Sequence, residues 1–301
     1  MKVPQRTVQV HVVNAFVRDG AGGNPAGVVI DADDLTSEDR QAVALQVGLS
    51  ETAFVSRSEV ADIRLEFFTP ARQIAHCGHA TVATFSLLNQ LGRLPSGTLK
   101  KETIDGLREV VLEGDRAFMR QLPPVGADLT PSELPTRHEL ADSLGLTPAA
   151  LSGGADPPCI MSTGNRFLLV QVPRVQDLAL LRPAHGLIAD LSEKLDLIGL
   201  YVYALQLGGQ AVATTRMFAP RFGIPEEAGT GMAAGPLACR LWQRGHAKAL
   251  AFEIEQGFFM TPPSGSRLFV RLDADESGVR SVSVGGHALR AGTREVQIWR
   301  R

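Results

Sequence analysis

The stretch that decides the fold is EFFTPARQIAHCGHATVATFSLLNQLG, residues 66–92, and its counterpart is RMFAPRFGIPEEAGTGMAAGPLACRLWQRG, residues 216–245. Each predicts a strand that ends in Phe-x-Pro, then a loop, then a helix of small and apolar residues that ends at glycine. A second pair, GGNPAGVVI at 22–30 and STGNRFLLVQV at 162–172, opens an apolar strand with a Gly-Asn turn. Because both pairs recur in the same order and about half a chain apart, they predict an internal duplication.

The surrounding segments predict an α+β chain. Alternating or apolar runs predict strands at 8–16, 26–30, 49–55, 63–68, 107–113, 116–122, 249–255, 267–272, 279–284 and 294–299. Thr36 and Asp39 fit a capping box, and Gly48 fits the C-terminal cap of the same helix. The helix at 79–92 has apolar and small residues on nearly every side, which predicts that it is buried. We therefore expect two similar α+β domains, each a strongly curved sheet around one apolar helix.

The Pro-rich stretch near Pro123 and Pro124 marks the expected domain boundary. We expect the first domain to comprise residues 1–122 and the second to comprise residues 123–287. The C-terminal strand, at about 288–301, is a candidate to complete the first domain.

Composition excludes several classes of function. The chain has 301 residues and a formal net charge of −2, so it has no basic field for nucleic acid or for an anionic membrane surface. No apolar run is long enough to span a membrane and the amino terminus lacks a signal-peptide core, which favours a cytoplasmic location. Three scattered cysteines favour reduced thiols over a disulfide framework.

Two related loops end at helix N-termini that are rich in small residues, CGHAT at 77–81 and GTGMA at 229–233. Amide groups at such an end can bind a carboxylate or phosphate. The alternative is that the glycines only let the helices pack closely and turn sharply. The run Gly229–Gly235 departs from the dinucleotide spacing G-x-G-x-x-G and follows no expected buried strand, so we expect no nicotinamide or flavin cofactor.

Glu51 lies in the predicted strand LSETAFV, residues 49–55. Alternation would place it on one face with Leu49, Ala53 and Val55. A carboxyl group among apolar neighbours is stabilised in its protonated form and can exchange a proton near neutral pH. From this pattern alone, a structural Glu that pairs with a nearby Arg is the more common case.

His76, Cys77 and His79 are the densest group of side chains that can bind metal. Zinc would need further ligands, and no second Cys/His cluster occurs in the sequence, so no metal site is expected. Cys77 at a helix N-terminus suits a nucleophile or a proton-transfer base. Its alternative role is that of a small buried hydrophobic residue.

Taken together, these residues resemble the phenazine-biosynthesis PhzF-like family, which shares its fold with diaminopimelate epimerase. The segments that carry the resemblance are GNPA at 23–26, LSETAFV at 49–55, FTPA through CGHAT at 68–81, MFAP through GIPE at 217–226, Thr230-Gly231 and AAGP at 233–236. The resemblance implies two pseudo-symmetric domains, each a barrel-like sheet around a central helix, with the active site in the cleft between them. It also implies cofactor-free proton transfer on a small carboxylate-bearing substrate, and a homodimer.

Carried over motif by motif, the family's acid/base glutamate falls on Glu51 and the histidine of its Gly-His motif falls on His79. The resemblance adds Glu227 as a third catalytic position. The substrate-binding positions implied are Asn24, Cys77, Gly78, Thr230, Gly231 and Met232.

The second loop departs from the family pattern Glu-Asp-Pro-Ala-Thr-Gly-Ser-Ala. Glu227 stands for the aspartate, Ala228 for the proline and Met232 for the serine. Met232 cannot donate the hydrogen bond of a serine, which argues against the phenazine precursor as substrate. Only the first loop has a cysteine, which argues against a two-thiol racemase.

The leading hypothesis is an isomerase or epimerase in which Glu51 moves a proton between two carbons, helped by His79 and Glu227 and by the two helix N-termini. One alternative is a lyase or dehydratase on the same fold that uses Cys77. The other is a non-catalytic protein that binds small molecules.

Overall fold

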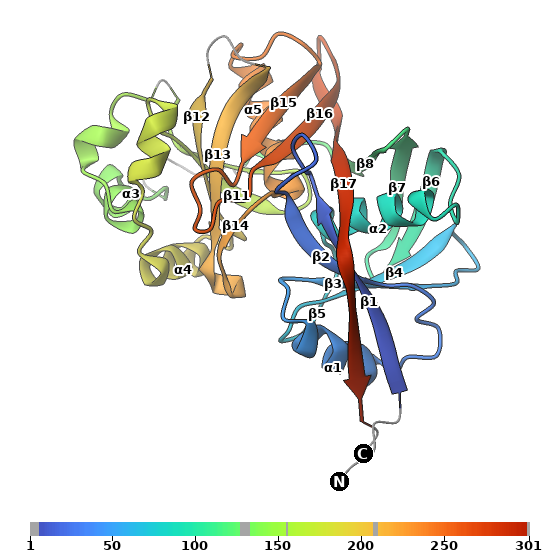
Figure 1. Cartoon of the computed structure of the whole chain (residues 1–301). Helices are drawn as coiled ribbons and strands as arrows, with labels where there is room; N and C mark the ends of the chain where they lie inside the picture. Colours follow the sequence, from blue (N-terminus) through green and yellow to red (C-terminus); the bar gives the residue numbers. More distant parts are fainter. Residues whose placement is uncertain (1–5, 127–132, 155, 207–209, 300–301) are drawn as a thin grey trace. The chain divides into compact units, whose positions relative to one another are not determined.

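A computed structural model describes residues 6–126, 133–154, 156–206 and 210–299 (Figure 1). The chain forms two compact units, one made of residues 1–120 with 285–301 and the other of residues 121–284. Within the described residues, no helix is long and apolar enough to cross a membrane.

The first unit is a closed barrel of eight strands among the residues described. Its elements are β1 (Arg6–Ala15), β2 (Asn24–Val29), α1 (Ser37–Val47), β3 (Thr52–Ser56), β4 (Ile63–Phe68), β5 (Gln73–Ile74), α2 (Gly78–Gln90), β6 (Gly97–Thr103), β7 (Gly106–Glu113), β8 (Arg116–Gln121) and the C-terminal part of β17 (Gly278–Ile298). The pairings are antiparallel β1/β2, parallel β2/β3, antiparallel β3/β4, parallel β4/β6 and antiparallel β6/β7/β8. β17 pairs with both β8 and β1 and closes the ring of eight strands; the short β5, which pairs with β4, is not part of this ring.

Helix α2 forms the core of this barrel. Every residue from Gly78 to Leu88 is buried, and the helix contacts β1, β2, β3 and β7 (Figure 1). A helix without a polar face must be enclosed, because exposing its apolar sides to water would cost about 25 cal/mol per Å². The predicted burial of this helix is confirmed.

Helix α1 covers the outside of the barrel. Thr36 and Asp39 form the predicted capping box, and Gly48 takes the left-handed conformation (φ 66°) at the C-terminal cap. Val43 and Val47 pack on a cluster with strand residues such as Val10.

The second unit repeats the same order of elements. Its members are β9 (Val125–Gly126), α3 (Arg137–Leu144), η1 (Pro148–Leu151), β10 (Cys159–Ser162), β11 (Arg166–Gln171), η2 (Val175–Leu180), α4 (His185–Lys194), β12 (Gly199–Leu205), β13 (Ala211–Ala219), η3 (Pro220–Phe222), β14 (Ile224–Glu227), α5 (Gly231–Gln243), β15 (Ala251–Gln256) and β16 (Ser266–Asp275). β10/β11 is antiparallel, β11/β12 parallel, β12/β13 antiparallel, β13/β15 parallel and β15/β16 antiparallel. This is the pairing sequence of β1 to β7, and α5 occupies the place of α2, so the predicted duplication is confirmed.

Several elements differ from the sequence-based expectations, and α3, α4 and β12 are among those that were not expected. The predicted strands at 279–284 and 294–299 are one strand, β17, because the turn signal of Gly285–Gly286 is overridden by pairing along its length. β6, with its polar sequence GTLKKET, was not expected. The residues before Gly229 form the short strand β14, where no strand was expected.

Candidate active site

The N-terminus of α2 lacks the side-chain cap that α1 and α3 have. Its N-cap residue, Cys77, makes no side-chain capping bond, and the first turn has no acidic residue. By contrast, the Thr36 hydroxyl caps α1 by accepting a hydrogen bond from the Asp39 amide at 3.1 Å. The first amides of α2 therefore keep their capacity to donate to an anion, and the helix dipole adds to the attraction.

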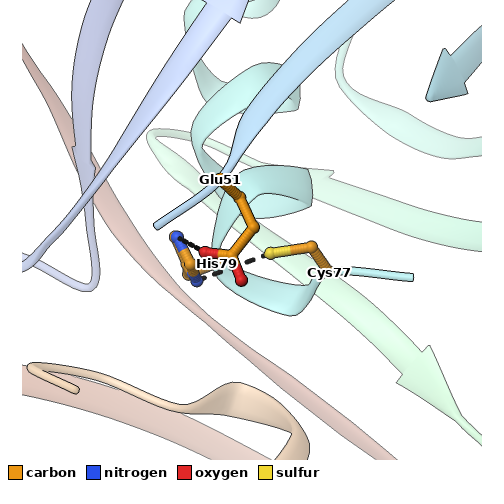
Figure 2. A group of neighbouring side chains, drawn as sticks. All are labelled: Glu51, Cys77 and His79. Atoms are coloured by element: carbon orange, nitrogen blue, oxygen red, sulfur yellow. Dashed lines mark hydrogen bonds and ion pairs between the residues drawn. The ribbon is translucent and has the colours of Figure 1, made fainter. Parts of the chain in front are cut away.

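Three side chains form a chain of contacts at this helix end (Figure 2). Nε2 of His79 lies 3.3 Å from Oε2 of Glu51, and Nδ1 of the same ring lies 3.5 Å from Sγ of Cys77. All three residues are buried. The imidazole therefore connects the carboxylate and the thiol, which is an arrangement suited to moving a proton between them.

Cys77 holds its proton at neutral pH. Burial raises the pKa of the Cys77 thiol, His79 lowers it and Glu51 raises it again, with a net increase. A thiol that keeps its proton is a hydrogen-bond donor and a poor nucleophile. This protonation state favours Glu51 over Cys77 as the base.

The same three residues have the composition of a metal site. One ligand atom from each lies within 4.8 Å of the others. The imidazole, however, faces Glu51 with one nitrogen and Cys77 with the other. A metal ion binds a single nitrogen of the ring, so Glu51 and Cys77 would both have to approach the ion on the side of that nitrogen. The geometry is that of a linear relay, and it does not fit a metal centre without rearrangement.

Glu51 is placed by the join between β2 and β3. Its carbonyl oxygen accepts a hydrogen bond from the Gly27 amide at 3.0 Å, next to the parallel pair Gly27 and Thr52. A Cβ on Gly27 would lie 2.8 Å from Thr52 Oγ1, so glycine permits this close approach. In the parallel register the starts of β2 and β3 share one end, which places buried Asn24 at the same end as Glu51.

The predicted face around Glu51 is wrong. β3 begins at Thr52, so Glu51 precedes the strand and alternation does not apply to it. Leu49 packs against the cluster that contains Phe54, whose side chain lies on the opposite face of β3 from Ala53. Glu51 is nevertheless buried, as expected.

In the second unit, the loop before α5 is fixed by a buried glutamine. Thr230 donates its hydroxyl to Oε2 of Glu227, and its amide donates to Oε1 of Gln256 at 3.1 Å. Nε2 of Gln256 donates to the Glu227 carbonyl at 2.7 Å and to Thr230 Oγ1 at 3.0 Å, and Tyr201 OH lies 3.0 Å from Oε1. Both Glu227 and Thr230 are buried.

The first turn of α5 resembles that of α2 in having neither a side-chain cap nor an acidic residue. The Gly231 carbonyl accepts a hydrogen bond from Nε2 of Gln121 at 2.8 Å. Met232 is buried, and its Cε would lie 3.1 Å from a Cβ on Gly164. Met232 thus packs against a glycine of the β10–β11 turn.

Sequence reasoning missed the glutamines that hold this loop. Gln121 and Gln256 lie in strands next to exposed or charged residues, and an isolated polar residue in a strand is usually on the solvent face. Their role depends on contacts across the sheet, which no local pattern encodes.

The duplicated barrel around a helix, with a buried carboxylate–imidazole pair at the helix N-terminus, defines a protein of the epimerase-type fold. The family model described as phenazine biosynthesis-like protein, PhzC-PhzF, matches residues 13–293, and the chain belongs to this family.

Named relatives agree with this class. The chain is 35% identical to an uncharacterized isomerase of Deinococcus radiodurans over 92% of this chain and 90% of that protein. It is 31% identical to the trans-2,3-dihydro-3-hydroxyanthranilate isomerase of Pseudomonas aeruginosa, over 92% of this chain and 94% of the relative. The crystal structure of the Bacillus anthracis phenazine biosynthesis protein of the PhzF family superposes with a TM-score of 0.88 at 29% identity, over 98% and 100% of the two chains. The chain is an isomerase of the PhzF-like family.

Proposed function

We propose that this isomerase moves a proton between two carbons of a small carboxylate-bearing substrate without a cofactor, with Glu51 as the general acid/base. The observation that carries the proposal is the buried Glu51–His79–Cys77 chain at the uncapped N-terminus of α2. It combines a proton acceptor with donors for the negative charge that develops when a carbon loses its proton.

In the proposed step, the Glu51 carboxylate takes a proton from one carbon, and the electron pair of the broken C–H bond moves into the π-system or carboxylate next to it. The neutral Glu51 then returns the proton to another carbon, or to the other face of the same carbon. The enzyme ends the cycle in its starting state, so the reaction balances as an isomerisation or epimerisation.

His79 has two tasks in this scheme. Its contact with Glu51 orients the carboxylate, and its contact with the protonated Cys77 thiol fixes the ring. The first amides of α2, at Gly78 and His79, are the proposed donors to the substrate carboxylate. Asn24 is proposed as a further substrate contact at the shared end of β2 and β3.

The second loop is proposed to bind the substrate through Glu227, Thr230 and Gly231. Glu227 is longer by one methylene than the aspartate of the family pattern, and Met232 replaces a serine hydroxyl with an apolar thioether. We therefore expect a substrate with an apolar group where the relative's substrate has a hydrogen-bonding one, and weak or no turnover of trans-2,3-dihydro-3-hydroxyanthranilate.

A second candidate function is a lyase or dehydratase in which Cys77 takes the proton. The 3.5 Å contact between Sγ and His79 Nδ1 favours it, since an imidazole can accept the thiol proton.

The experiment is a turnover screen in which NMR follows a panel of cyclic and acyclic amino and hydroxy carboxylates, including trans-2,3-dihydro-3-hydroxyanthranilate. Glu51→Gln is expected to reduce turnover at least about 10³-fold, and Glu59→Gln, at an exposed position in the same unit, to leave it unchanged. Turnover that survives Glu51→Gln but is lost in Cys77→Ala would favour the lyase. Thermal stabilisation by a carboxylate of the panel that is not turned over would contradict the proposed reaction on that substrate.

A further inference from the structure

A fully buried lysine lies beside the first turn of α2. Lys101, on β6, has no exposed surface, and its Nζ donates to Thr81 Oγ1 at 2.5 Å. Thr81 Oγ1 donates in turn to the Cys77 carbonyl oxygen at 2.6 Å. Nζ also lies 5.0 Å from the centre of the Phe67 ring. Among the residues that the structure describes, no carboxylate pairs with this lysine.

Such a residue is costly, because a buried ammonium loses its hydration without an opposite charge to replace it. Burial is the main cause that lowers the pKa of Lys101 to about 7; the electrostatic interaction with Cys77 acts in the opposite direction, and Arg108 lowers the pKa further. The neighbouring His76 is neutral, since burial first, and then Lys101 and Arg108, lower its pKa to about 3. Cys77 and Arg108 are thus the groups that act on the pKa of Lys101, and Lys101 in turn acts on His76.

A purely structural explanation accounts poorly for this arrangement. An apolar side chain of the same length would fill the space between α2 and β6 without the desolvation penalty. The lysine makes two contributions that an apolar side chain would not make. It donates a hydrogen bond to the Thr81 hydroxyl, which in turn donates to the Cys77 carbonyl oxygen. It also places a positive charge inside the barrel, at the same end of α2 as Glu51 and His79.

We propose that Lys101 is a positioning residue for the site at the N-terminus of α2. Through Thr81 it fixes the first turn, and its ammonium adds positive charge behind the amide groups that receive an anion. The identity of this anion as a substrate carboxylate rests on the proposed function. The contact of Lys101 with Thr81 and the charge of its ammonium group do not depend on that function.

The test uses two alkylating probes of matched size, the anionic iodoacetate and the neutral iodoacetamide, with the modification of Cys77 measured by mass spectrometry of its peptide. The same thiolate attacks both reagents, so the ionised fraction of the thiol cancels in the ratio of the two rates, and the ratio reports the local electrostatic potential. No turnover is needed, so a failure here is distinguishable from a failure of the proposed function.

In the wild type, the iodoacetate-to-iodoacetamide ratio is expected to fall as the pH rises through about 7, where Lys101 loses its proton. Lys101→Met is expected to lower the ratio at pH 6 by at least about threefold and to flatten its pH dependence. The matched control is Lys100→Met, because Lys100 is the adjacent residue and is exposed. A ratio in Lys101→Met equal to that of the wild type and of Lys100→Met at pH 6 would overturn the proposal.

A second measurement tests the contact even if Lys101→Met folds poorly or Cys77 reacts slowly. With ¹³Cε-labelled lysine, one of the five lysine resonances is expected to titrate with a pKa near 7. The chemical shift of this resonance is expected to change in Thr81→Val and to stay the same in Thr81→Ser, which keeps the hydroxyl. A Lys101 resonance that titrates above 9, or one that is insensitive to Thr81→Val, would contradict the proposal.

Discussion

The contribution of Gln256 to the second unit can be estimated from its contacts. Its amide pairs with the Thr230 amide and the Glu227 carbonyl, and Gln256 has no exposed surface. Gln256→Met keeps the length of the side chain but removes its amide group, so that the Thr230 amide and the Glu227 carbonyl both lose this hydrogen-bond partner. The hydroxyl of Tyr201 keeps its contact with Thr215 at 3.0 Å. At about 1–3 kcal/mol for each of these two buried groups that loses its partner, we expect a loss of about 2–6 kcal/mol in the free energy of unfolding.

The assay is urea unfolding followed by tryptophan fluorescence in a Trp299→Phe background. Trp242, on α5, is then the sole tryptophan and reports on the second unit. The control is Gln243→Met, at an exposed position on the same helix, which is expected to change stability by less than about 0.5 kcal/mol. A loss below about 1 kcal/mol in Gln256→Met would refute the claim that this glutamine holds the loop.

Three further predictions concern stability. Because the pKa of Lys101 is lowered to about 7, the unfolded state binds more protons between about pH 7 and 10; the wild type should therefore gain stability relative to Lys101→Met as the pH rises through this range, as measured by urea midpoints. Burial raises the pKa of Asp156, but the hydrogen bond from Arg244 and nearby positive charges leave this pKa below its usual value. The ionised Asp156 therefore stabilises the folded state, and this contribution is lost as the pH falls through the lowered pKa. The pH-dependent loss should be missing in Asp156→Asn. Gly199→Ala should lower the melting temperature of the second unit by several degrees, because its Cβ would lie 2.1 Å from the Phe218 carbonyl oxygen.

Much of the fold could be predicted from local chemistry. The capping box at Thr36, the left-handed Gly48 and the enclosed helix after Cys77 each depend on residues a few positions apart, and all three are present. The duplication could be predicted because both copies kept their Phe-x-Pro and Gly-Asn signals.

The remaining features depend on pairing between distant segments. The polar strand that carries Lys101 gives no local signal, since two adjacent lysines in a strand suggest solvent exposure. Gln256 likewise acquires its role only from contacts with a loop near Thr230. For the site, motif positions identified Glu51, Cys77 and His79, but the link that the imidazole makes between the other two required coordinates.

The most direct test of the central claim is the exchange of a carbon-bound substrate proton with solvent. With a substrate from the turnover screen in D₂O, wild-type protein is expected to incorporate deuterium at the reacting carbon, as followed by ¹H NMR. Glu51→Gln should reduce that rate at least about 10³-fold while still binding the substrate. Exchange at the wild-type rate in Glu51→Gln would contradict the assignment of Glu51 as the acid/base.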